Sequence, residues 1–127
     1  MPRPAATQPT EVELQILRVL WERGSCTARQ IHDARTERKD TNYSTTVKML
    51  SVMLDKGLLK RDDAARPHIY RPAASRQATQ RRMLRDLIRN AYSGSAGSLV
   101  LQALSSQRAS PDELAAIRRL LDEMEGK

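Results

Sequence analysis

Residues 41–62, TNYSTTVKMLSVMLDKGLLKRD, contain a predicted helix whose exposed side carries unusually little charge. Ser44 is a favourable N-cap, and Gly57 is a favourable left-handed stop. At about 100° per residue, one side of this helix is apolar: Val47, Leu50 and Leu54. The side roughly opposite holds short or flexible groups: Thr45, Met49, Val52 and Lys56. An ordinary solvated face is rich in charged residues, so this side predicts contact with a partner.

Two further helices are predicted before this one. Thr10 and Glu13 form a capping box ahead of the apolar run VELQILRVLW, and Gly24 ends that helix. Thr27, with Gln30 three residues later, opens a second helix. This second helix has little apolar surface to bury: Ala28, Ile31 and Ala34. It is therefore expected to be a thin cover over its neighbours.

After the third helix the pattern changes from helical to extended. Residues 58–61 and 68–71 form two short runs with a polar segment between them, and Pro72 ends the second run. This pattern predicts a β-hairpin. Three helices followed by a hairpin are typical of a winged helix-turn-helix domain, although an unrelated α+β domain has the same element order. The compact spacing and the weakly charged third helix favour the winged domain.

The remainder of the chain predicts helices only. A basic helix spans residues 75–92, SGSAGS interrupts it, and a short helix begins at Leu99. A capping box with Pro at the first position starts the last helix after Ser110. The sequence therefore predicts a mainly α protein with a small β-hairpin. Its expected parts are a mobile tail at 1–9, a winged helix-turn-helix domain at 10–73 and a C-terminal helical dimerisation region at 75–127.

The apolar sides of the C-terminal helices are too extensive for one small monomer to bury. The last helix repeats apolar residues at steps of three and four, which is a heptad-like seam. A second copy of the chain would cover these sides, so we expect a homodimer; alternatively the seam folds back on the first domain. The residues expected at the dimer contact are Leu84, Leu87, Leu101, Leu104, Leu114, Ile117, Leu121 and Met124.

The charge balance is basic, with 22 Lys and Arg against 15 Asp and Glu and a net charge of +7. This balance favours a polyanionic partner such as nucleic acid. The single cysteine excludes an intrachain disulfide and a zinc site made of cysteines. No apolar run reaches the roughly 18 residues of a membrane span, and the first ten residues lack the layout of a signal peptide. We therefore expect a cytoplasmic protein.

The third helix has the features of a helix that enters the major groove of DNA, a slot about 12 Å wide. Hydroxyl groups reach base edges or phosphates, methyl groups contact thymine, and no acid lies between Asp40 and Asp55 to repel phosphate. Basic side chains are expected around it, where they would neutralise backbone phosphates: Arg29, Arg35, Lys60, Arg61, Arg66, His68 and Arg71. Two alternatives stay open. Met49, Val52 and Met53 could pack under the hairpin or against the last helices, or the helix could dock a protein instead of DNA.

No constellation of catalytic or metal-binding residues is evident. Cys26 and His32 would need further ligands, and none is suitably spaced. No serine has the flanking glycines of a nucleophile turn, and GSAGS near residues 94–98 lacks the lysine of a phosphate-binding loop. We therefore expect neither an enzyme nor a metal or cofactor site.

Four segments together resemble the BlaI/MecI/CopY family of penicillinase-type repressors. They are PTEVELQILRVLW (9–21), YSTTVKMLSVMLDKGLLKRD (43–62), RPHIYRP (66–72) and SPDELAAIRRLLDEME (110–125). The second segment is the most specific of the four. The resemblance implies a winged-helix transcriptional repressor that binds a palindromic operator as a dimer held by its C-terminal helices.

The resemblance also implies roles for single residues. Base-edge contacts are expected from Thr45, Thr46 and Met49. Lys48 is expected at a phosphate or groove edge, and Tyr43 and Ser44 would anchor the start of the helix. The hairpin tip, residues 63–66, would lie over the adjacent DNA backbone.

The release of repression is implied less directly. In the antibiotic-sensing branch of the family, a membrane sensor peptidase leads to a cut in the dimer region at a bond like Asn-Phe. The matching stretch GSLVLQALSS has Gln102 and Ala103 at this candidate cleavage position, which departs from that pair. The copper-responsive branch carries closely spaced cysteines near its C-terminus, and this chain has none there. The implied targets are antibiotic-resistance or related stress genes.

Overall fold

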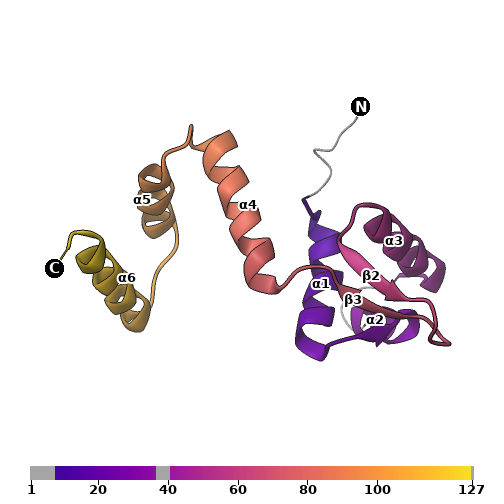
Figure 1. Ribbon diagram of the computed structural model, residues 1–127. Coiled ribbons are helices and arrows are strands. Elements are labelled where there is room, and N and C mark those ends of the chain that lie inside the picture. Colours follow the sequence, from indigo (N-terminus) through magenta and orange to yellow (C-terminus); the bar gives the residue numbers. More distant parts are fainter. Residues whose placement is uncertain (1–7, 37–40, 127) are drawn as a thin grey trace. The chain divides into compact units, whose positions relative to one another are not determined.

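A three-stranded antiparallel sheet and three helices form the first part of the chain (Figure 1). The computed structural model describes residues 8–36 and 41–126. Most of the predicted tail, residues 1–9, lies outside the described residues. In chain order the elements are α1 (Glu11–Arg23), β1 (Cys26–Thr27), α2 (Ala28–Thr36), α3 (Tyr43–Asp55), β2 (Leu59–Asp62), β3 (Ile69–Pro72), α4 (Arg76–Ala91), α5 (Ala96–Ser106) and α6 (Pro111–Met124).

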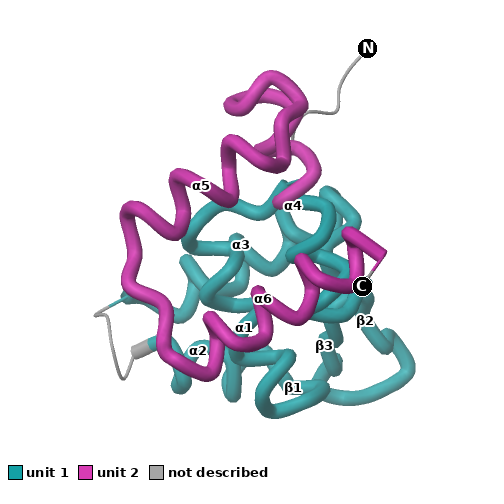
Figure 2. The backbone as a smooth tube through the Cα atoms, turned by 90° about the vertical axis from the view of Figure 1, so that its left-hand side faces the viewer, with its two compact units in different colours: residues 1–83 teal, residues 84–127 magenta. Residues whose placement is uncertain are grey.

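The chain divides into two compact units, with the division between Met83 and Leu84 (Figure 2). The division falls inside α4, so the first two turns of that helix belong to the first unit. Trp21 of α1 attaches the segment before α4 to the first unit, because its indole Nε1 donates a hydrogen bond to the carbonyl of Ala74 at 3.1 Å. The buried side chain of Thr79 also lies in this part of α4.

The order of the strands is β1-β3-β2, and all pairs are antiparallel. The predicted hairpin is confirmed, with each strand beginning one residue later than expected. Strand β1 has only two residues, Cys26 and Thr27, which pair with Tyr70 and Ile69. So short a strand has no detectable period in the sequence, which is why it was not predicted. The first unit is a winged helix-turn-helix domain.

Local capping explains where the first two helices begin. The hydroxyl of Thr10 accepts from the backbone N–H of Glu13 at 3.2 Å, and the Glu13 carboxylate accepts from the N–H of Thr10 at 2.9 Å. Thr27 and Gln30 make the same two bonds before α2, at 3.2 and 2.9 Å. Each pair satisfies backbone N–H groups that the first turn of a helix leaves without a partner.

The buried side of α3 differs from the predicted one. Leu50 is fully buried as expected, but the other fully buried positions are Thr46 and Met53, each one residue before the predicted Val47 and Leu54. Val47 is instead 38% exposed. The helix also begins one residue before Ser44, with Asn42 at the N-cap. Tertiary packing causes this difference in the buried side of α3, because the core accommodates the flexible Met53 side chain and the hydrogen-bonded Thr46 hydroxyl.

The core forms where α1, α2 and α3 meet the sheet. Its buried apolar residues are Ile16, Leu17, Leu20, Cys26, Ile31, Leu50, Met53, Leu58, Leu59 and Tyr70. Burial raises the pKa of the Cys26 thiol, and the nearby charge of Arg23 lowers it by less. These contacts fix the helices to the sheet, because burying one such side chain contributes about 1.5–3 kcal/mol.

An ion pair links the start of α1 to the end of α3. The Lys56 ammonium lies 2.7 Å from the Glu13 carboxylate, whose side chain is 3% exposed. Lys56 was predicted on the partner-facing side of α3, and this contact assigns it to the interior side instead. The same carboxylate also completes the capping box at Thr10, so one buried charge has two donors.

Thr46 connects α2 and α3 through its buried hydroxyl. Its Oγ1 lies 2.9 Å from His32 Nδ1 and accepts from Arg35 Nη1 at 3.0 Å. Both partners are themselves buried, each with 8% of its surface exposed. The predicted base-edge contact of Thr46 is therefore wrong, and so is the predicted phosphate contact of Arg35. Both side chains face the interior, where they position α3 against α2.

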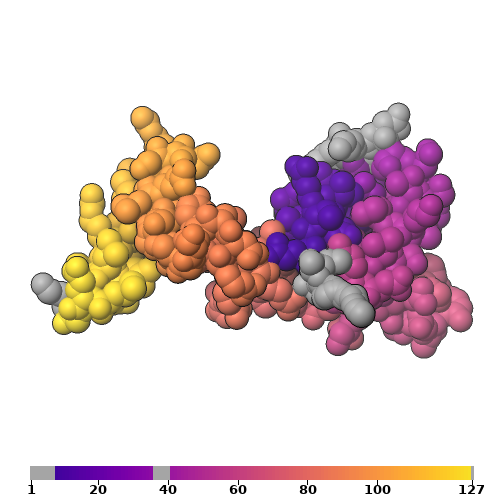
Figure 3. Space-filling view, turned by 90° about the horizontal axis from the view of Figure 1, so that it is seen from above, coloured from indigo at the N-terminus to yellow at the C-terminus, as the bar shows by residue number. Residues whose placement is uncertain are grey.

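The second unit contains the end of α4 together with α5 and α6. Ser95 caps α5, and Ser110 with Glu113 forms the predicted capping box of α6, with Pro111 at the first position. None of the described residues from 84 to 126 is buried, and Figure 3 shows α5 and α6 in orange to yellow at the surface. Over residues 8–36 and 41–126, no helix is both long and apolar enough to cross a membrane.

Replacing Thr46 by Val tests the buried hydroxyl. The change keeps the shape of the side chain but removes the oxygen that contacts His32 Nδ1 and accepts from Arg35 Nη1. We expect the free energy of unfolding to fall by about 1–3 kcal/mol, measured by urea denaturation. Thr45→Val, on the exposed side of the same helical turn, is the matched control and should change stability far less. Equal losses for the two variants would contradict the assigned role of Thr46.

Candidate nucleic-acid interface

The exposed side of α3 combines hydroxyls, methyl groups and one ammonium. Ser44, Thr45 and Lys48 are exposed, and Val52 is 43% exposed. Val47 joins this side because of the rotation of the helix, although the sequence pattern assigned it to the core. From Tyr43 to Val52 this face has no carboxylate. Such a surface can approach phosphates without repulsion and offers groups that contact base edges and the thymine methyl.

Met49 has an intermediate position. It is partly buried and packs against the core, so only part of the side chain is available to a partner. Of the three residues that the alternative places in packing contacts, Met53 is buried, Met49 is partly buried, and Val52 is 43% exposed.

An open cleft of about 500 Å³ lies between the starts of α2 and α3 and the hairpin. Four of the predicted DNA-binding residues line it: Arg29, Tyr43, Arg66 and His68. These residues come from three segments that are distant in the sequence. Among the described residues, the cleft walls carry two guanidinium groups and no carboxylate. Its chemistry therefore suits a phosphate group of a nucleic-acid backbone.

Tyr43 is held in a stack at the edge of this cleft. The guanidinium carbon of Arg29 lies 4.2 Å from the centroid of the Tyr43 ring, and the His32 ring meets Tyr43 edge-on at 5.5 Å. His32 in turn contacts Thr46, so the stack connects an exposed cation to the buried polar contact beneath α3. Tyr43 is the first residue of α3, and the contact with its ring orients Arg29 toward the surface.

The start of α3 is itself open to an anion. Asn42 makes no side-chain capping bond, and the first turn carries no acidic residue. The Asn42 side chain therefore leaves the first backbone N–H groups of the helix uncapped, and these groups carry partial positive charge. This feature adds to the positive potential beside the Arg29 guanidinium.

Lys60 and Arg71 form a second cationic site, on the hairpin. They are direct partners in the register of β2 and β3, so both exposed side chains project from the same side of the sheet. Like charges directly opposite one another destabilise a pair of strands. An anionic partner would remove this repulsion. Neither residue lines the cleft that contains Arg29 and Arg66.

The hairpin tip is held by its own side chains. Arg61 donates to the Asp63 carboxylate, Arg66 donates to the Asp63 and Ala65 carbonyls, and the Asp62 carboxylate accepts from the Ala64 N–H at 3.0 Å. The hydrogen bond from Arg61 lowers the pKa of the Asp63 carboxyl. The tip therefore keeps a charged carboxylate beside its arginines.

The described residues offer no alternative metal chemistry. Within residues 8–36 and 41–126, no three or more His, Cys, Asp and Glu residues gather in a way that could hold a metal ion. Of the two histidines, His32 contacts Thr46 and His68 lines the cleft.

Comparison with known proteins identifies the family. The model of the penicillinase repressor family matches residues 9–123. The transcriptional regulator BlaI of Mycobacterium tuberculosis, in strains CDC 1551 / Oshkosh and ATCC 25618 / H37Rv, is 30% identical over 121 residues, 94% of this chain and 86% of the relative. The penicillinase repressor of Bacillus licheniformis is 22% identical over 116 residues, 91% of each chain.

These matches cover both the winged domain and the C-terminal helices. The predicted family resemblance is thereby confirmed, and the family is one of transcriptional repressors and not of enzymes. The chain belongs to the penicillinase repressor family.

Proposed function

We propose that the protein represses transcription by binding a palindromic DNA operator as a homodimer, with α3 in the major groove. The observation that carries the proposal is the exposed face of α3, which has Thr45 and Lys48 outward and no acid from Tyr43 to Val52. The names of the relatives, a transcriptional regulator and a penicillinase repressor, support the regulatory role.

The surroundings of α3 support the same docking mode. Arg29 lies at one end of the helix, and the Lys60–Arg71 pair lies on the hairpin. In a winged domain these two groups would contact backbone phosphates on either side of the groove and fix the register of α3. Thr45 would then contact a base edge, while Val47 and Val52 would meet thymine methyl groups.

The second unit supports self-association. Its described residues include large apolar side chains at the surface, with Leu101 71% and Met124 74% exposed. Leu84, Leu87, Leu104 and Leu121 are each at least 40% exposed, and Leu114 and Ile117 are half-buried. Helices with such faces gain free energy when a second copy covers them, and two copies would present two α3 helices to a twofold operator.

The signal that releases the operator is a separate part of the proposal. A membrane sensor peptidase upstream, with a cut between Gln102 and Ala103, follows from the family resemblance. Both residues are exposed but lie inside α5, whose helical backbone extends to Ser106. A protease that binds extended chains would act here only after α5 opened, and control of antibiotic-resistance genes by this route is part of the same proposal.

Binding to the DNA upstream of the protein's own gene tests the operator. We expect a complex confined to one palindrome, because base contacts add to the phosphate contacts. Its affinity should fall steeply between about 50 and 200 mM salt, since each neutralised phosphate releases bound cations. Fluorescence anisotropy with a scrambled duplex of equal length is the control. Equal affinity for both duplexes would refute operator recognition and favour the protein-docking alternative.

Lys60→Glu separates DNA binding from stability. The new carboxylate lies opposite Arg71, so the strand pair should be as stable as in the parent or more so. Operator affinity should nevertheless fall about tenfold or more, because a phosphate contact is replaced by a repulsion. The thermal midpoint and the anisotropy titration are measured on the same sample. Asp122→Lys, a charge reversal on α6, is the control for charge reversal far from the hairpin in sequence. An unchanged affinity for Lys60→Glu would remove this pair from the interface.

Ile117→Asp combined with Leu121→Asp tests the dimer. Each carboxylate would be buried without a partner at the proposed contact, which is strongly unfavourable. Multi-angle light scattering should give a mass near the 14.3 kDa of one chain for the variant and near twice that for the parent. Arg119→Asp, on the opposite side of α6, should stay dimeric. A double variant that remains dimeric would show that α6 does not form the contact.

A further inference from the structure

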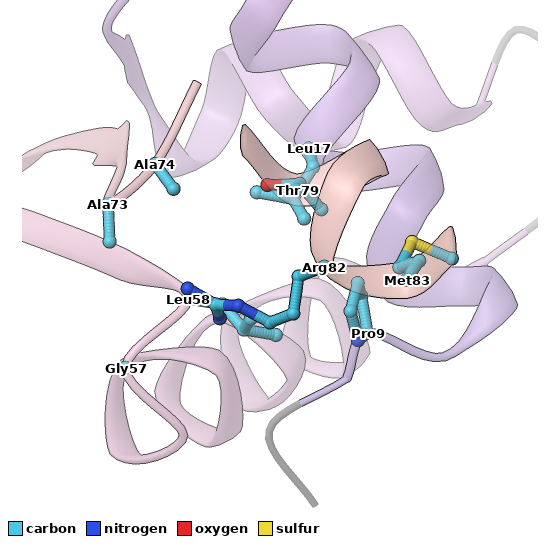
Figure 4. A pocket seen from close by; sticks show the side chains of 9 residues that line it. All are labelled: Pro9, Leu17, Gly57, Leu58, Ala73, Ala74, Thr79, Arg82 and Met83. Carbon is cyan, nitrogen blue, oxygen red and sulfur yellow. The ribbon is translucent and has the colours of Figure 1, made fainter. Parts of the chain in front are cut away.

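A small cavity in the first unit lies behind the end of α3, and none of its lining residues lines the DNA-facing cleft. Its volume is about 110 Å³ (Figure 4). Its walls come from five places: Pro9 before α1, α1 itself, the turn after α3, the segment after β3, and the first two turns of α4. The cavity is thus next to both the end of α3 and the start of the helix that continues into the second unit.

The walls of this cavity are mainly apolar. Leu17 and Leu58 contribute side chains that are nearly completely buried, and Ala74 and Met83 extend the apolar surface. Gly57 contributes no side chain to the wall. An apolar group of matching size would fill the cavity without displacing any buried polar atom.

The cavity lining combines a neutral polar group with a positively charged group. Thr79 supplies a hydroxyl and Arg82 a guanidinium, and no carboxylate belongs to the lining. Figure 4 shows the Arg82 side chain extending from α4 toward Leu58. A guanidinium stays protonated and binds a carboxylate through two parallel hydrogen bonds. The charge of the cavity therefore favours an anion and disfavours an amine.

The volume limits the size of the ligand. An apolar protein cavity of about 150 Å³ holds benzene. A cavity of about 110 Å³ therefore accepts a slightly smaller group, on the order of four carbon atoms.

We propose that this cavity binds a small organic carboxylate with an apolar body of about four carbons. The carboxylate pairs with Arg82 and accepts from the Thr79 hydroxyl, and the carbon chain packs on Leu17 and Leu58. Such a ligand contacts Gly57, in the turn directly after α3, as well as α4. Its binding therefore changes the affinity for the operator. Only this last consequence depends on the proposed DNA-binding function; the binding of the carboxylate does not.

Titration of the full-length protein with pentanoate, followed by amide chemical shifts, tests the binding. We expect saturable shifts centred on Gly57, Leu58 and Thr79. Pentylamine has the same chain with the opposite charge, and acetate has the same charge without the chain. Both should bind about tenfold more weakly or worse, because each lacks one half of the recognition. No saturable shift with pentanoate would overturn the proposal, and so would equal binding of pentylamine.

Two variants locate the site. Arg82→Gln should weaken pentanoate binding about tenfold or more, because the charged pair is lost. Arg81→Gln removes the same charge from the adjacent position of α4, outside the cavity, and should keep affinity within about twofold. Ala74→Leu should abolish binding by filling the space. Thermal melts without ligand check that all three fold. Equal weakening by Arg82→Gln and Arg81→Gln would show a general charge effect and refute the site.

The operator titration separates this proposal from the proposed function. If pentanoate binds and alters operator affinity in the parent but not in Arg82→Gln, both stand. If pentanoate binds while no operator is recognised, the cavity stands and the repressor function fails. If the operator is bound and pentanoate gives no amide shifts, the cavity proposal alone is refuted.

Discussion

The hydroxyl of Thr46, held between His32 and Arg35 inside the domain, determines which side of α3 faces outward. A helix with apolar residues on several sides can pack in more than one rotation, and α3 has methyl-bearing groups almost all round. Burying Thr46 with two hydrogen-bond partners makes one rotation favourable, because any other would separate the Thr46 hydroxyl from His32 and Arg35. The same rotation turns Val47 to the surface beside Lys48. The proposed interface therefore depends on a contact inside the domain.

The charges around the outward side of α3 give that side a preference for an anionic partner. The opposed Lys60 and Arg71 repel each other in the isolated chain, whereas Arg29 makes a favourable cation–π contact with Tyr43. A polyanion would relieve this repulsion and would also pair with Arg29. Glu13 shows the contrasting case, because its charge is buried with Lys56 and contributes to the fold and not to the surface. The positions of the charges, more than the net value of +7, give the interface its character.

Features that depend on neighbours in the sequence could be predicted, whereas features that depend on distant neighbours could not. The capping boxes at Thr10 and Ser110 and the stop at Gly57 involve residues within a few positions of one another, and the hairpin follows from two adjacent extended runs with a turn segment between them. Thr46 was predicted at a base edge because its partners lie 11 and 14 residues away, and nothing in the spacing indicates that pairing. Lys56, whose partner is 43 residues away, was misplaced for the same reason. The DNA contacts and the dimer seam stay predictions, because they involve molecules other than this chain.

The hydrogen bonds within the hairpin tip affect how strongly the wing, the hairpin of β2 and β3, attracts ions from solution. Arg61 is already paired with Asp63, and Arg66 is directed onto backbone carbonyls of the same turn. The tip is therefore partly neutral, and its arginines attract fewer diffuse counterions than their number suggests. Long-range attraction would come mainly from the strand cations and the start of α2, so an approaching polyanion would be guided to the base of the wing before it met the tip.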